Sequence, residues 1–248
     1  MQNIDPIFII QPVIVIGFSV GIVLYWHWKE RFTRYVLGFS LLAYGGAITA
    51  KVAFQYITAP SFLFVSQGSL WLLGLYLGLQ TMIFEVGGAY LVARFAVSRH
   101  RMKKNDGVGY GLGLAFWENG IIIGATSLLT LLSYFITIAQ GGTAADSLYS
   151  FLSQSQPQLF YPPLYALQII GWGLLERASS LMAHLSWGYL CLRSVTSHRK
   201  GYLFLALPIG LIDFLVPFAR IMTVPIFEIV VFAFAALCTL ATVYATRS

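Results

Sequence analysis

Seven long runs of apolar residues divide this 248-residue sequence, and they constrain its fold more than any other feature. A helix that crosses a lipid bilayer needs roughly 20 mostly apolar residues. Seven stretches meet this requirement: residues 7–26, 35–57, 68–97, 107–139, 163–195, 202–219 and 223–245. The sequence therefore predicts an all-α, polytopic membrane bundle of about seven transmembrane helices. We expect residues 1–248 to form a single transmembrane domain, with the first apolar run retained as a helix.

The composition supports lipid as the solvent for much of this chain. Hydrophobic residues make up 58% of the sequence and charged residues only 10%, against roughly 25% charged residues in a typical soluble domain. The net charge of +6 lies in short loops between apolar runs and forms no basic domain. We therefore expect the lipid bilayer as a partner and no binding of nucleic acid.

The basic residues alternate between loops, and this alternation predicts the orientation of the helices. Lys and Arg gather after the first, third and fifth apolar runs, whereas the other loops hold almost none except Arg220. Cytoplasmic loops of membrane proteins collect Lys and Arg. The N-terminus is therefore expected outside and the C-terminus inside, in a multi-pass protein of the cell membrane.

Several ionisable residues fall inside the predicted helices, where they are costly and usually mark function. They are Lys51, Glu85, Glu118, Glu176, Arg177, His184, Asp213 and Glu228. Four of them, Glu85, Glu118, His184 and Asp213, lie 11 or 12 residues from the inner ends of four different helices. At ~1.5 Å per residue they share a depth of roughly 17 Å. We interpret these four residues as a candidate catalytic site; the alternative is that each is a satisfied polar residue of the bundle core.

The remaining ionisable residues receive supporting or structural roles. Lys51 and Glu228 fall near the outer ends of their predicted helices, where we expect them to snorkel or to act structurally. Arg177 and His184 share one stripe of the fifth helix, with Glu176 beside it. We expect Arg177 to pair with Glu176 and to be the only strong cation placed to offset the carboxylates.

Three carboxylates and one imidazole at one depth limit the possible chemistry. Because like charges repel in a low-dielectric layer, either some carboxyls are protonated, or His184 is a cation, or a metal lies among them. Glu118 and His184 are candidate ligands for a divalent metal such as zinc, with an open position for water. A glutamate can also act alone as a general base on water.

Short motifs around these residues resemble one family of membrane proteins. The run Phe84–Leu91 resembles the Glu-Glu-x-x-Arg helix of the YhfC-type intramembrane metalloproteases. The run Gly111–Asn119 resembles that family's Gly-x-Gly-His-Gly-x-x-Glu segment, and is closer to a Gly-Phe-Ala-x-x-Glu-Asn segment of the related PrsW proteases. Glu176-Arg177 followed by His184 is similar to the family's Glu-Arg…His helix. Asp213 falls where type II CAAX prenyl proteases carry a His-x-x-x-Asn/Asp element.

This resemblance implies hydrolysis of peptide bonds in or near the membrane. It assigns Glu85 as general base, with Glu118 and His184 orienting water or metal, and a membrane peptide as substrate. Some motif positions differ: Val86 replaces the second Glu, Ala89 the Arg, and Leu114 the His.

These differences leave two other functions open. The first alternative is a catalytically inactive scaffold of the same superfamily that binds a membrane protein partner, since that superfamily also resembles the scaffold subunit of gamma-secretase. The second is a small-solute or proton-coupled transporter, because a row of carboxylates can also carry protons or cations.

Overall fold

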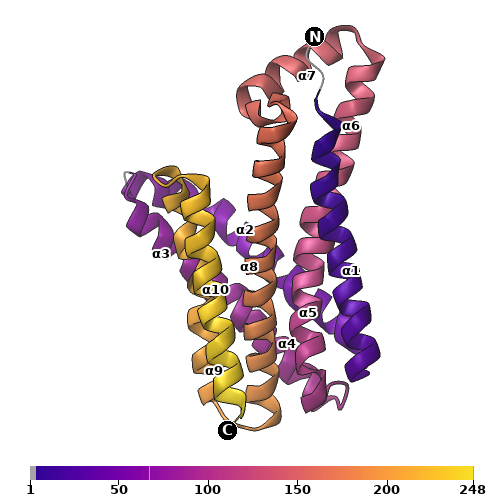
Figure 1. Cartoon of the computed structure of the whole chain (residues 1–248). Coiled ribbons are helices and arrows are strands. Elements are labelled where there is room, and N and C mark those ends of the chain that lie inside the picture. The colour runs from indigo at the N-terminus through magenta and orange to yellow at the C-terminus, as the bar shows by residue number, and fades with distance from the viewer. Residues whose placement is uncertain (1–3, 67, 248) are drawn as a thin grey trace.

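The computed structural model describes residues 4–66 and 68–247, and within these ranges the secondary structure is helical, without strands. The helices form one elongated bundle (Figure 1). This confirms the predicted all-α membrane fold, because the described helices match the seven expected runs in order and position. The first two are η1 with α1 (Pro6–Ile9, Ile10–Glu30) and α2 (Tyr35–Ser66). The third is α3, η2 and α4 (Leu70–Gln80, Thr81–Val86, Gly87–Ser98).

The second half of the chain continues the same pattern. The fourth span is η3, α5, η4 and α6 (Lys104–Asp106, Gly107–Ala115, Phe116–Ala125, Thr126–Gln140). A helical connection, α7 and η5 (Gly142–Ser155, Pro157–Phe160), leads to the fifth span, α8 (Pro163–Thr196). The sixth span is α9 with η6 (Gly201–Ala206, Leu207–Arg220), and the seventh is α10 (Val224–Arg247).

Six of these spans are long and apolar enough to cross a membrane by length and composition. The exception is α8, which has 34 residues but carries Glu176, Arg177, His184 and several serines. In the bundle α8 packs against α5 and α10, and Figure 1 shows α8 in the middle of the helices. Its low hydrophobicity therefore fits its place in the interior, where neighbouring helices shield its polar face.

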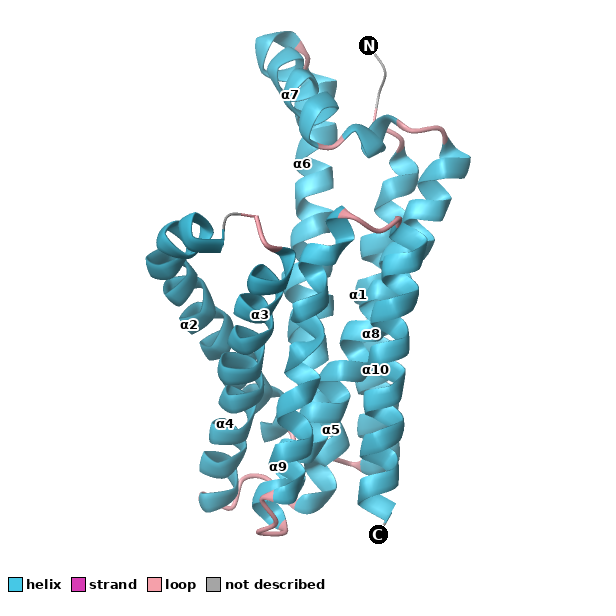
Figure 2. Ribbon diagram, turned by 90° about the vertical axis from the view of Figure 1, so that its left-hand side faces the viewer, coloured by secondary structure: helices cyan, strands magenta, loops and turns pink. Residues whose placement is uncertain are grey.

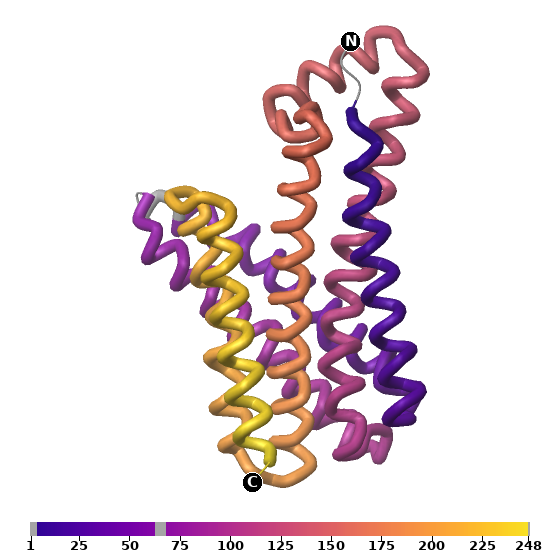
Figure 3. The backbone as a smooth tube through the Cα atoms, viewed as in Figure 1, coloured from indigo at the N-terminus to yellow at the C-terminus, as the bar shows by residue number. Residues whose placement is uncertain are grey.

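The two sides of the bundle differ in height. Figure 1 and the tube in Figure 3 show α1, α6 and α8 rising together toward α7, whereas α2, α3 and α10 end lower. A small apolar cluster joins the taller side under α7, with Phe8, Leu152, Leu159 and Ile170 buried against one another. The start of α1 and the end of α10 lie at opposite ends of the molecule.

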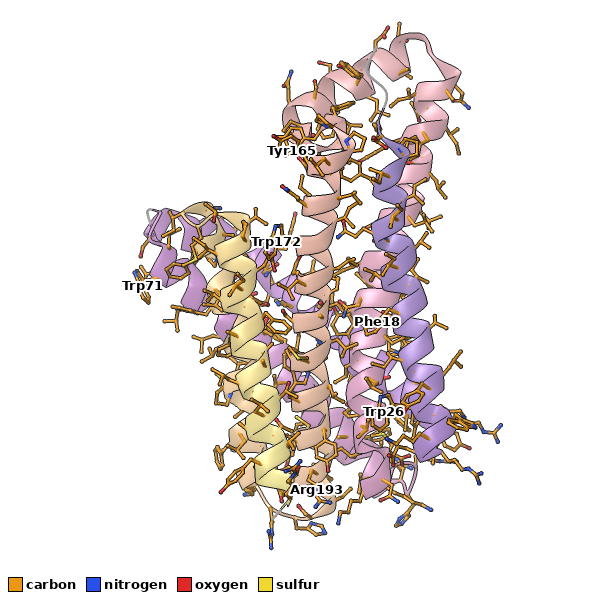
Figure 4. The ribbon with its side chains drawn as sticks, in the orientation of Figure 1. Phe18, Trp26, Trp71, Tyr165, Trp172 and Arg193 are labelled. Atoms are coloured by element: carbon orange, nitrogen blue, oxygen red, sulfur yellow. The ribbon has the colours of Figure 1, made fainter. Side chains whose placement is uncertain are left out.

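The main hydrophobic core lies toward the end that carries the C-terminus. Its largest buried side chains include Tyr110, Trp187 and Leu192, and Figure 4 shows Trp26 and Arg193 in this half, far from Tyr165. α5 and α8 approach very closely here, since a Cβ on Gly188 would lie 2.6 Å from the Cα of Gly111. Small residues at such a crossing allow the backbones to come together. The polar residues of the candidate site lie between this core and the taller end.

Candidate active site

Four segments position the candidate site, and three of them depart from α-helical geometry. Glu85 lies on the π-helical segment η2 and Glu118 on the π-helical segment η4. Asp213 lies on the 3₁₀ helix η6, and only His184 lies on a regular α-helix, α8. π-helical turns inside α-helices occur frequently at functional sites. The π-helical geometry of η2 and η4 therefore distinguishes the segments that carry Glu85 and Glu118 from the other described helices.

Proline accounts for the geometry of η6. Pro208 is in its first turn and Pro217 inside it. Because proline has no N–H, Pro217 cannot donate to the carbonyl of Asp213 four residues earlier. In the structure a 3₁₀ helix replaces the α-helix over Leu207–Arg220.

Glu85, Glu118 and His184 converge on one point. One ligand atom from each lies within 4.8 Å of the others. His184 Nε2 is 2.9 Å from Glu118 Oε2 and 3.7 Å from Glu85 Oε2. Glu85 and His184 are also buried, with 7% and 3% of their surface exposed. Three spans that are distant in sequence thus supply two carboxylates and one imidazole to a single enclosed place.

The imidazole of His184 is held in a defined orientation. Its Nδ1 lies 2.9 Å from the carbonyl oxygen of Ser180, which can only accept, so Nδ1 carries the proton and donates. The ring packs against Trp187 and Tyr44, at centroid distances of 4.2 and 5.7 Å. Nε2 faces the two carboxylates without a directed hydrogen bond to any described residue. A neutral imidazole in this orientation presents a lone pair to the site.

Lys51 belongs to the site, and the prediction that it snorkels at an outer helix end is wrong. Its Nζ donates to Thr81 Oγ1 at 2.6 Å, Glu85 Oε1 at 2.7 Å and Asp213 Oδ2 at 2.9 Å. The helix was expected to end at residue 57, but α2 continues through Pro60 to Ser66. Lys51 therefore lies well inside the span, and all three of its ammonium hydrogens are used.

Asp213 joins the site through Lys51. Besides Lys51, its Oδ2 accepts a short hydrogen bond from Thr81 Oγ1. The structure thus divides the four predicted residues into a cluster of Glu85, Glu118 and His184 and a Lys51–Thr81–Asp213 clamp attached to Glu85. Sequence reasoning missed Thr81, although it precedes Glu85 by four residues and so lies on the same helical face.

Arg177 pairs with more than its neighbour. It bonds to Glu176, as predicted, and its Nη1 also lies 3.3 Å from Glu118 Oε1 and 3.1 Å from Asn119 Oδ1. Ser180 Oγ donates to the same Glu118 oxygen at 2.9 Å. Glu118 is therefore held on one oxygen by Arg177 and Ser180, and its other oxygen faces His184. Because Lys51 is a second buried cation, the expectation that Arg177 alone offsets the carboxylates is also wrong.

Glu228 does not snorkel either. It is 6% exposed, and its Oε2 has no hydrogen-bond partner among the described residues. The α10 helix that carries it begins at Val224, so Glu228 lies in the first turns of this helix and faces inward. It does not line the cavity described next.

A cavity of about 370 Å³ contains the candidate site. Its walls include the ionisable residues of this site: Lys51, Glu85, Glu118, Glu176, Arg177, His184 and Asp213. Four carboxylates, Glu85, Glu118, Glu176 and Asp213, face two permanent cations, Lys51 and Arg177, which leaves two formal negative charges when His184 is neutral. Apolar side chains from five segments complete the walls, among them Ile48, Ile122, Val216 and Phe227.

The residues present fit a divalent metal ion. Carboxylate oxygens and imidazole nitrogens are both ligands of Zn²⁺, and three protein ligands leave a fourth position for water. Metal ligands also need hydrogen bonds from neighbouring groups that fix their orientation. Here His184 donates to the Ser180 carbonyl, and Arg177 and Ser180 donate to Glu118. An excess of two negative charges would be neutralised by one divalent cation. Glu85 lies within 4.8 Å of the two predicted ligand candidates, Glu118 and His184.

Comparisons with known proteins identify the family of this chain. The sequence model of one family, described as YhfC intramembrane metalloprotease, matches residues 14–233. A curated relative, the "Uncharacterized membrane protein YhfC" of Bacillus subtilis (strain 168), is 30% identical over 141 residues, covering 55% of this chain and 52% of the relative. The match thus spans about half the length of that relative, and no solved structure matches. With most of its length matched, this multi-pass membrane protein belongs to the YhfC intramembrane metalloprotease family.

Proposed function

We propose that this protein hydrolyses peptide bonds in or near the membrane. The observation that supports the proposal most is the convergence of Glu85, Glu118 and His184 in one buried cavity. Water-activating sites need a base and an orienting group within about 3 Å of one reacting atom or one water away from it. The family to which the chain belongs points to the same class of reaction.

The roles of Glu85, Glu118 and His184 follow from which carboxylate oxygens already accept hydrogen bonds within the protein. Glu118 and His184 would hold the metal ion, since they lie closest together and their orientation is fixed by Arg177, Ser180 and the Ser180 carbonyl. A bound divalent ion lowers the pKa of its water and polarises a carbonyl. Glu85 has one oxygen held by Lys51 and Thr81, and its other oxygen faces the cluster. This free oxygen is placed to take a proton from water as general base.

The cavity walls indicate the class of substrate. Beside its charged residues, the cavity is lined by apolar side chains, among them Ile48, Ile122, Val216 and Phe227. A peptide segment with apolar side chains can bury them there, while its scissile carbonyl faces the charged groups. We therefore propose an apolar membrane peptide as substrate.

The test is cleavage of a membrane-peptide library by purified protein in liposomes, with metal content measured in parallel. Glu85→Gln keeps the shape of the side chain but cannot accept a proton, so cleavage should be lost while bound metal is retained. Glu30→Gln, at the end of α1, is the matched control and should cleave like the wild type. If wild type and Glu85→Gln are equally inactive across the library, and no metal copurifies, the catalytic proposal is abandoned. Loss of metal from Glu85→Gln would make Glu85 a ligand and not the base.

One observation favours the alternative of an inactive scaffold. Lys51 and Arg177 already form direct ion pairs with Glu85 and Glu118, an arrangement that also serves a polar core used only for packing. Under this alternative the protein binds a membrane partner, and the same library assay returns no cleavage with any metal added.

We also propose that the basic end of the bundle faces the cytoplasm. Lys and Arg of three loops and the tail gather at the end that carries the C-terminus. A protease-sensitive tag inserted at Lys103 should be cut only from the cytoplasmic side in sealed vesicles. Cutting from the outer side would reverse the orientation.

A further inference from the structure

A second polar cavity lies at the basic end of the bundle, away from the candidate active site. It has a volume of about 490 Å³ and opens between the ends of α4 and α8 and the link to α9. Figure 2 shows α4 and α9 together at this end. Its lining residues are Tyr90, Arg94, Val97, Ser98, Ser194, Val195, His198 and Lys200. Three of these side chains are basic and none is acidic.

The basic side chains of this cavity are available to a ligand. Among residues 4–66 and 68–247, the side chains of Arg94, His198 and Lys200 have no hydrogen-bond or ion-pair partner. The two serines, in contrast, already donate to backbone: Ser98 Oγ to Phe95 O at 2.8 Å and Ser194 Oγ to Arg199 O at 3.2 Å. The free donors are therefore a guanidinium, an ammonium, an imidazole and the Tyr90 hydroxyl, which is a set that suits an anion with several oxygens.

We propose that this cavity binds a phosphate group, supplied by the head group of an anionic phospholipid. Arginine binds phosphate through two parallel N–H donors, and lysine adds a point charge. Basic pockets between transmembrane helices at the cytoplasmic face are typical sites for such head groups.

The surroundings favour a lipid over a free anion. Large apolar side chains next to the cavity residues are exposed, with Leu91 63% and Phe95 48% exposed on α4 and Phe204 68% exposed on α9. In a bilayer these side chains face the acyl chains. A lipid bound through its phosphate would therefore lay its tails along α4 and α9.

The experiment compares wild type with two charge-matched double variants in detergent. Arg94→Gln with Lys200→Gln removes two cations from the cavity, whereas Arg99→Gln with Lys103→Gln removes two cations outside it. Native mass spectrometry with phosphatidylglycerol, phosphatidylcholine or inorganic phosphate counts the bound molecules. The wild type and the control should retain phosphatidylglycerol over phosphatidylcholine, and the cavity variant should bind it about tenfold more weakly or worse.

Each other outcome overturns part of the proposal. Equal weakening in both double variants would mean general attraction to a basic surface and no site. Retention of inorganic phosphate without retention of phosphatidylglycerol would remove the lipid as source. If wild type shows no preference for phosphatidylglycerol and no phosphate binding, the site does not exist. None of these readouts depends on peptide cleavage, so they are independent of the proposed catalytic function.

Discussion

The two polar regions of this bundle differ in how their charges are balanced. In the middle, each permanent cation bonds to carboxylates, with Lys51 between Glu85 and Asp213 and Arg177 between Glu176 and Glu118. At the basic end, Arg94 and Lys200 line a cavity without an acidic residue. A buried charge must be paired because desolvation is costly, whereas a charge at the interface keeps water until a ligand replaces it. The charges in the middle of the bundle are therefore part of the fold, whereas Arg94 and Lys200 at the basic end are free to bind a ligand.

The largest expected effect tests whether the central region does chemistry as well. His184→Ala removes the imidazole that faces Glu118, so cleavage should fall by at least about 10²-fold, and bound metal should be lost. His198→Ala makes the same chemical change at the basic end and is the matched control, with cleavage and metal content unchanged. The assay is peptide cleavage in liposomes together with metal analysis. Equal effects of both variants would contradict the distinction between the two regions.

The next effect concerns stability. Lys51→Met leaves Glu85 and Asp213 without their cation, and breaking a buried ion pair in this way should lower the free energy of unfolding by about 3 kcal/mol. Removing a positive charge beside the cluster should also tighten binding of a divalent metal, although Glu85 is no longer held for catalysis. Unfolding by SDS titration and metal titration measure the two changes.

The double variant Lys51→Met, Asp213→Asn provides the control for this prediction. It removes one unpaired carboxylate and should recover part of the lost stability. A change below about 0.5 kcal/mol in the single variant would show that Lys51 is not an essential counter-ion.

A smaller loss is expected from Glu176→Gln. The Glu176 side chain is 46% exposed, and Arg177 keeps Glu118 and Asn119 as partners. The free energy of unfolding should therefore fall by about 1 kcal/mol or less. Asn119→Ala, which deletes a buried amide that also donates to the Arg177 carbonyl at 3.2 Å, should cost more, at about 1–3 kcal/mol. The reverse order in SDS titration would mean that Glu176 is the main partner of Arg177.

The smallest effect is expected at the basic end. Arg94→Gln should change the free energy of unfolding by no more than about 0.5 kcal/mol in detergent without anionic lipid, because no ion pair or hydrogen bond is lost. Added phosphatidylglycerol should then stabilise the wild type more than the variant. A large loss in its absence would show that Arg94 has a structural role.

The sequence predicted the spans and part of the site for identifiable physical reasons. Hydrophobicity defines a bilayer span, and the constant rise of a helix allows depth to be counted, which is how Glu85, Glu118 and His184 were grouped. Lys51 was misplaced because the apolar run was taken to end at residue 57, whereas α2 continues to Ser66. Depth counted from that wrong end placed Lys51 away from Glu85. The pairing of Arg177 with Asn119 was also missed, since a depth estimate contains no information about which way a side chain points.

The π-helical segment η4 changes how the fourth span should be drawn. In an α-helix each residue turns the chain by about 100°, and a segment with i→i+5 bonding holds more residues per turn than 3.6. Every side chain after Ala125 is therefore rotated away from the place that a continuous helical wheel from Gly107 would give it. Residues 107–140 therefore need two helical wheels, one before and one after residues 116–125. Deleting one residue from 116–125 would rotate α6 relative to α1, and the length of the span would hardly change.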